Sequence, residues 1–260
     1  MEHVLKRLGA GFALLAGLLS VINVAQAQGR SPLSSLEAAV KSLQAAVECL
    51  NLPTVIVNVP LLARGTYSVT GGAIGGGISL VGRPNGLGPY RNYFVFDLSV
   101  LGDKDLVLGA QLITYNPPGG FLSDSTDTLT FVLNRVSTSD KALMNGSAGT
   151  LGYLDLADGP VYGTYVASSA VNGSQITIAL SDKAIRDIYR SRHNGFSDAF
   201  EPYLFALGGS IAELNMGVGI AGNAYFLAFG DTLPLTNTAL ELNVKHYSDG
   251  CPPPTSTQYQ

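Results

Sequence analysis

The sequence predicts an all-β fold, a jelly-roll-like β-sandwich with a short N-terminal helix and one further short helix. From Thr54 onward, apolar and polar residues alternate at the two-residue period of β-strands. The segments between these runs are turn material, rich in glycine and proline, of which the chain holds 31 and 13. Only 13% of the 260 residues are charged, and a chain of this length can bury one large core. We therefore expect one main domain.

Residues 1–27 have the pattern of a signal peptide. Lys6 and Arg7 precede an apolar run over residues 8–24, and the small residues that follow end at Ala27. The run contains glycines and polar residues, and it is shorter than the roughly 20 apolar residues that a spanning helix needs. We expect cleavage between Ala27 and Gln28. The mature chain is then secreted, extracellular or held in the cell envelope, with no membrane insertion.

Residues 28–52 contain the N-terminal helix. Ser34 and Glu37 fit a capping box, in which each residue satisfies a backbone amide at the helix start. Apolar residues then follow at alternating spacings of four and three, the pattern of a coiled-coil seam. These residues are Leu36, Val40, Leu43, Val47 and Leu50. The seam predicts either self-association or packing of the helix on its own sandwich.

Residues 53–250 form the predicted sandwich. Turn signals separate its strands, among them Asn145-Gly146 and Asn172-Gly173. The second helix is expected at residues 181–192, closing one end of the sandwich. The expected strands lie at residues 93–98, 106–113, 128–136, 161–167, 175–180, 203–207, 224–229 and 239–244.

Cys49 and Cys251 are the two cysteines of the chain. In an exported protein they predict a disulfide that closes a loop of about 200 residues and, in the chain-entropy model, contributes up to about 5 kcal/mol. Pairing between chains is the alternative. Residues 251–260 form a polar tail.

Four strand and turn motifs carry a resemblance to a known group of proteins. They are YRNYFVFDLS at residues 90–99, YNPPGGF at 115–121, VYGTY at 161–165 and FALGG at 205–209. Over residues 66–243 the chain resembles bacterial secreted β-sandwich proteins, many of which carry a PEP-CTERM sorting tail. The resemblance implies export and fold, but no activity. The tail is absent here, so we expect release or retention by another means.

The sequence predicts a protein that is not an enzyme. The formal net charge of −4 gives no basic surface for nucleic acid. His193 and His246 lack metal-ligand spacing, and the chain contains no G-x-S-x-G motif. Glu201 and Glu213 are the one carboxylate pair to consider for glycoside hydrolysis, which ranks third among the functions.

Residue types suggest two binding sites, one for polysaccharide and one for calcium. Strand alternation places an aromatic and polar strip, suited to polysaccharide, on the segment that holds Tyr90, Arg91, Tyr93 and Asp97. The alternative is that these tyrosines fill the second face of a sandwich strand. Clustered loop aspartates suit calcium, although aspartate is also a common turn residue. These are Asp124, Asp127, Asp155 and Asp158.

Two functions therefore remain open, and no cofactor is expected apart from calcium. The first is a non-catalytic structural protein that is secreted or envelope-associated and self-associates through the heptad seam. The alternative is a surface polysaccharide-binding module that uses tyrosines and calcium.

Overall fold

The computed structural model describes residues 32–74, 79–84, 87–193, 203–215, 222–227, 237–247 and 251. They belong to two compact units. One contains helix α2 (Pro32–Leu50) and the chain up to Pro53, together with Tyr247 and Cys251, and the other is Thr54–His246. The predicted signal peptide, including Ala27 and Gln28, lies outside the described residues.

Helix α2 begins earlier than the capping box predicts. Its first residue is Pro32, so Ser34 lies within the first turn and is not the N-cap. Proline is favoured at the first helical position because the N–H group it lacks would have no partner inside the helix. The predicted cap is therefore wrong, although the helix itself is present.

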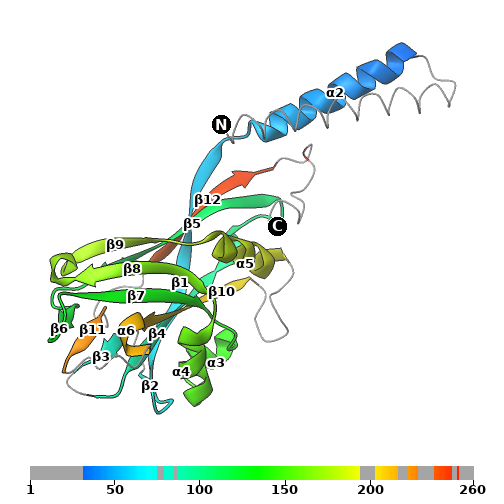
Figure 1. Ribbon diagram of the computed structural model, residues 1–260. Helices are drawn as coiled ribbons and strands as arrows, with labels where there is room; N and C mark the ends of the chain where they lie inside the picture. Colours follow the sequence, from blue (N-terminus) through cyan, green and yellow to red (C-terminus); the bar gives the residue numbers. More distant parts are fainter. Residues whose placement is uncertain are drawn as a thin grey trace. The chain divides into compact units, whose positions relative to one another are not determined.

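The second unit is all-β and sandwich-like, as predicted, with antiparallel strands throughout (Figure 1). Strand β1 (Thr54–Ser68) belongs to both of its sheets. Sheet A has the strand order β1, β12 (Ala239–His246), β5 (Asp105–Asn116) and β9 (Ser174–Ala179). Sheet B has the order β1, β4 (Tyr90–Asp97), β10 (Leu204–Ile211), β7 (Thr128–Arg135) and β8 (Val161–Ser168).

Strand β1 passes from one sheet to the other at a β-bulge. Residues 54–60 pair with β12, whereas the pairing from Leu61 onward is with β4. The register shifts between Leu61 and Ala63, which leaves Leu62 as the extra residue. Bulges bend a strand and increase its twist, and this is how a strand can change sheets in a sandwich.

Short strands extend sheet B, and two 3₁₀ helices lie on connections from sheet B to sheet A. Of the strand predicted at 224–229, residues 224–227 are described, and the strand is observed over Ala224–Phe226. The short elements are β2 (Ala73–Ile74), β3 (Val81–Arg83), β6 (Leu122–Ser123), β11 (Ala224–Phe226) and the 3₁₀ helices η1 (Leu98–Val100) and η2 (Ser169–Val171).

The main core lies between the two sheets. Phe94, Phe131, Leu112 and Leu242 are fully buried in it. Helix α5 (Asp182–His193), expected at 181–192, adds Ile188 to this core and packs against β5. The apolar stripe of Ile185 and Ile188 on this helix therefore faces the sandwich.

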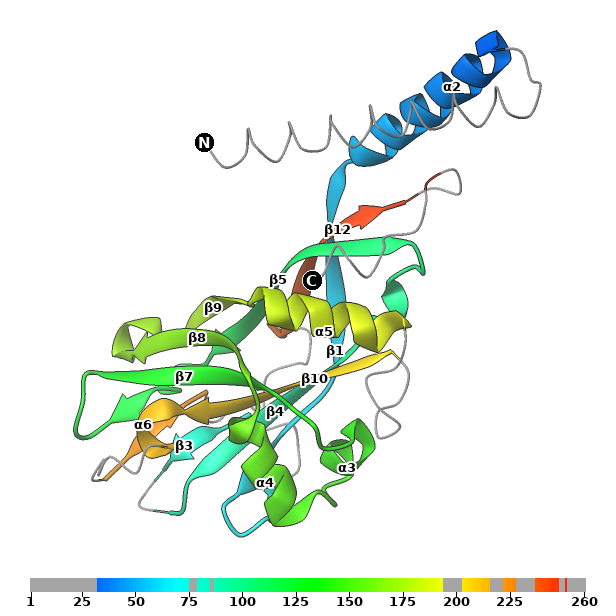
Figure 2. The same cartoon turned by 45° about the vertical axis from the view of Figure 1, so that its right-hand side comes forward.

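A second core covers the other face of sheet B. Helices α3 (Asp140–Met144) and α4 (Gly149–Asp158) lie over this face and pack on β1, β4 and β10 (Figure 2). Tyr67, Tyr93 and Leu156 are among its buried members. Strands β4 and β10 are consequently buried on both faces.

Helices α3, α4 and α6 (Ala212–Asn215) were not predicted. Helix α4 contains Gly149 and Gly152, and glycine is a weak helix former, so its sequence gives little helical signal. The close approach of α4 to β10 requires a glycine at 208. A Cβ atom there would lie 2.5 Å from the carbonyl oxygen of Leu156.

Candidate functional site

Three of the four residues of the predicted strip, Arg91, Tyr93 and Asp97, make structural contacts around β4. Tyr93 is only 6% exposed and lies in the second core. Tyr90 is half-buried at the start of the strand. Asp97 caps η1, because its carboxylate accepts a hydrogen bond of 2.9 Å from the amide of Ser99. The strip is therefore not an exposed aromatic platform, since α3 and α4 cover the face on which sequence alternation placed it.

Arg91 holds α4 and α6 against the sheet. Its guanidinium donates hydrogen bonds to the carbonyl oxygens of Tyr153, at 2.8 Å, and Leu154, at 3.0 Å. It also donates to Asn215 Oδ1 at 2.8 Å, and its Cζ atom lies 4.3 Å from the centroid of the Tyr153 ring. The Arg91 guanidinium, which the sequence analysis considered for ligand binding, therefore already has partners within the protein.

The predicted calcium ligands lie on two different elements. Asp124 follows β6, and its carboxylate accepts hydrogen bonds from the backbone and side chain of Asn223. Asp127 lies three residues later in the chain and is exposed. Asp155 and Asp158 lie in α4, so the prediction that they occupy a loop is wrong. Over the described ranges, no group of three or more His, Cys, Asp or Glu side chains is arranged to hold a metal ion.

Asp155 has a structural partner instead. Its carboxylate accepts hydrogen bonds from the amides of Ser137 and Thr138, which follow β7. The helix forms because its buried face packs on sheet B, and this tertiary contact overrides the turn preference of aspartate and glycine in the sequence.

The histidines and glutamates considered for catalysis also make local contacts. His193 stacks on Tyr189 with ring centroids 4.0 Å apart. His246 pairs with the carboxylate of Asp105 across strands β12 and β5. Glu213 accepts hydrogen bonds from the amide of Thr130 at 3.0 and 3.1 Å. Glu201 lies outside the described residues.

One polar pocket lies beneath α5, and sequence patterns did not indicate it. Tyr162 in β8 donates a hydrogen bond of 2.6 Å to the carboxylate of Asp187 in α5. Both residues are buried, and burial together with this carboxylate raises the pKa of the Tyr162 hydroxyl. The cavity beside them measures about 10 Å³, which is close to the space one water molecule needs. The pair therefore anchors α5 to the sandwich.

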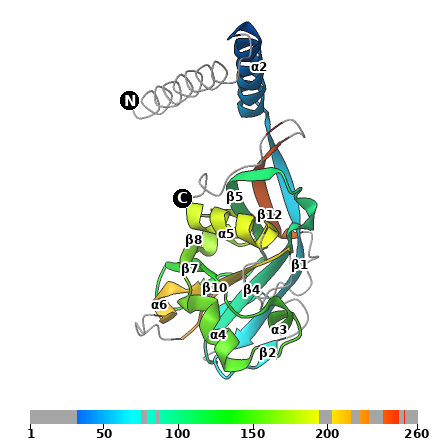
Figure 3. The ribbon, with the colours of Figure 1, turned by 90° about the vertical axis from the view of Figure 1, so that its right-hand side faces the viewer.

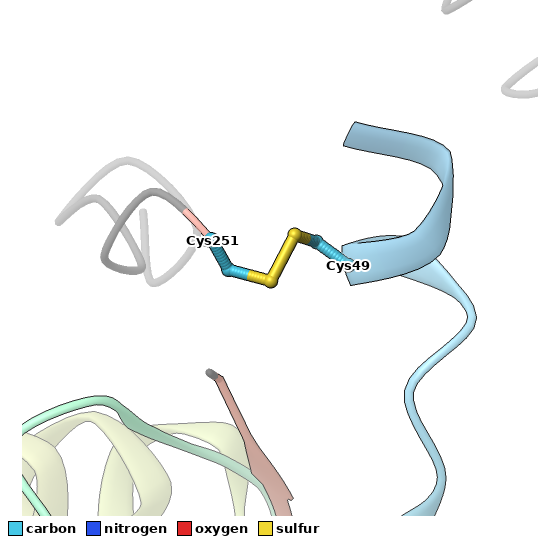
Figure 4. The surroundings of a disulfide bond; sticks show 2 residues. All are labelled: Cys49 and Cys251. Atoms are coloured by element: carbon cyan, nitrogen blue, oxygen red, sulfur yellow. A yellow bond between two sulfur atoms is a disulfide. The ribbon is translucent and has the colours of Figure 1, made fainter. Parts of the chain in front are cut away.

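The N-terminal unit carries the remaining predicted features. Cys49 and Cys251 form a disulfide, as predicted, at the C-terminal end of α2 (Figure 4). In the heptad seam, Leu36, Val40 and Val47 are 40%, 42% and 45% exposed. These three side chains form an exposed apolar stripe on the helix.

No protein-family model matches the chain, and no curated protein is significantly similar to it. The resemblance to the bacterial secreted β-sandwich proteins therefore stays a prediction. Within the part of the chain that the structure describes, no helix has the length and apolar character to cross a membrane.

Proposed function

We propose that this protein is a non-catalytic structural protein of the extracellular space or cell envelope, and that it self-associates through α2. The observation that carries the proposal is the exposed apolar stripe of Leu36, Val40 and Val47. Burying such a stripe against a partner is favourable by roughly 25 cal/mol for each Å² of apolar surface removed from water.

The occupant that best fits the stripe is the α2 helix of a second copy. Its spacing assigns valine to the a positions, at 40 and 47, and leucine to the d positions, at 36, 43 and 50. β-Branched residues at a combined with leucine at d favour parallel two-stranded coiled coils. The seam contains no charged residue, so two identical seams can meet without repulsion.

The disulfide is compatible with this pairing. By helical periodicity, Cys49 lies on the side of α2 opposite the stripe. A bond at Cys49 therefore fixes the end of the helix and leaves the seam accessible. Two heptads bind weakly alone, because short helices gain little from pairing, so additional contacts between the copies are expected.

The experiment measures the mass of the purified mature protein by sedimentation equilibrium over a wide range of concentrations. We expect a reversible dimer whose dissociation constant rises by about tenfold or more in Val40→Glu, which places a charge in the seam. Ser42→Glu is the matched control, because Ser42 is exposed on the same helix outside the stripe. A monomer at every concentration would contradict the proposal.

A further inference from the structure

Among the residues that the structure describes, the edge of sheet A formed by the first half of β1 has no partner strand. Residues 54–60 pair with β12 on one side, and among the described residues no strand pairs with them on the other. Figure 3 shows β1 beyond β12 and β5 at this side of the sheet. Strand β4 joins β1 only from Leu61 onward. Within the described ranges, the backbone N–H and C=O groups on this side of residues 54–60 therefore have no partner strand.

The composition of the open edge favours strand pairing. Residues 54–60 read TVIVNVP and contain no charge, and valine, isoleucine and threonine are strong strand formers. Ile56 is 63% exposed. Natural edge strands are commonly protected by lysine, by a bulge or by short length. In this chain the bulge at Leu62 lies after residues 54–60, and Pro60 is the last residue of the edge. Neither feature interrupts residues 54–59.

We propose that the open edge of β1 pairs antiparallel with the same edge of a second copy, which makes sheet A continuous across the dimer. The inference rests on the proposed self-association and names a second interface for it. Antiparallel pairing of identical strands is two-fold symmetric, as a closed dimer requires. Because residues 54–60 carry no charge, the symmetric pairing brings no like charges together.

The two interfaces support one another. A stable protein interface buries about 1,600 Å² in total, and neither two heptads nor one short strand pair is large. Asn51, Leu52 and Pro53 alone separate α2 from the open edge along the chain. The same pair of chains can therefore form both contacts, and each contact raises the effective concentration for the other.

The test combines a charge substitution with hydrogen exchange on the purified mature protein. Ile56→Lys introduces on the edge the residue that natural edges use against pairing. We expect it to raise the dimer dissociation constant by about tenfold or more. Leu108→Lys is the matched control, because Leu108 is 49% exposed on β5, two strands away from the edge. We expect its effect to be less than about threefold.

Hydrogen exchange locates the contact. In the wild-type protein, amides within residues 54–60 should exchange about tenfold more slowly above the dimer dissociation constant than below it. If the protein dimerises while exchange at 54–60 is independent of concentration, the edge proposal is overturned and the α2 proposal stands. Equal effects of Ile56→Lys and Leu108→Lys would overturn it too. A protein that never dimerises overturns both.

Discussion

Removing the disulfide between Cys49 and Cys251 should lower the free energy of unfolding substantially. The two cysteines are 202 residues apart, and a cross-link of that span reduces the entropy of the unfolded chain by an amount equivalent to about 5 kcal/mol. In the folded protein, β1 pairs with β12 so that Thr54 lies opposite Lys245. The strand ends that lead to the two cysteines therefore stay paired without the bond, and the loss is expected to arise mainly in the unfolded state.

The double variant Cys49→Ser with Cys251→Ser measures this effect. We expect urea denaturation to show a loss of about 4 kcal/mol, below the chain-entropy limit, as is usual for disulfides. The melting temperature should fall by about 10 °C for a chain of this size. The wild-type protein treated with a reductant is the control and should behave like the variant.

Two outcomes would refute the reasoning on the disulfide. A loss below about 1 kcal/mol would mean that the cross-link does not restrict the unfolded chain as the loop length predicts. Disulfide-linked dimers on a denaturing, non-reducing gel would mean that Cys49 and Cys251 pair between chains instead of within one.

Two further predictions concern buried tyrosines. Tyr162→Phe should cost about 1–3 kcal/mol of unfolding free energy, because the buried Asp187 carboxylate loses the hydrogen bond that Tyr162 donates. In a double-mutant cycle with Asp187→Ala, additive losses in urea denaturation would contradict a direct coupling. Burial raises the pKa of Tyr93 from 10.0 to about 12. The folded state then holds a proton that the unfolded state releases above pH 10. Stability should therefore be lost between about pH 10 and 12, by up to about 1.4 kcal/mol per pH unit for this group. A Tyr93→Phe variant should show a shallower decline, and unchanged stability of the wild type up to pH 11 would contradict the cause.

The sequence by itself indicated most of the longer strands, the two longer helices and the two cysteines that form the disulfide. Strand alternation is a local property, so it located β4, β5 and β7 to β9 to within a few residues. The turn signals were also local. Gly146 and Gly173 adopt positive φ angles of 77° and 74°, which glycine reaches without the steric cost of a Cβ atom. The apolar stripes of α2 and α5 have a helical period that reads directly from the chain.

Only the tertiary structure decided which faces of these elements are buried. Alternation in β4 distinguishes two faces but does not say whether a helix layer covers the second one. The sequence therefore left open whether Tyr93 belongs to a binding strip or fills the second face, and the structure shows the latter. The sequence did not indicate helix α4, because the segment has weak helical propensity. Contacts with sheet B, including the close approach at Gly208, stabilise the helix.

Tertiary packing also decides two other features. These are the pairing of Tyr162 with Asp187 and the edge formed by β1. The two polar side chains are 25 residues apart and meet because α5 packs on the sandwich. A bulge at Leu62 moves β1 from sheet A to sheet B, so β4 pairs only with its second half, and no described strand pairs with that side of the first half. Local sequence patterns determine which segments become strands and helices. The packing of the sheets and helices determines which of their side chains and backbone groups are covered.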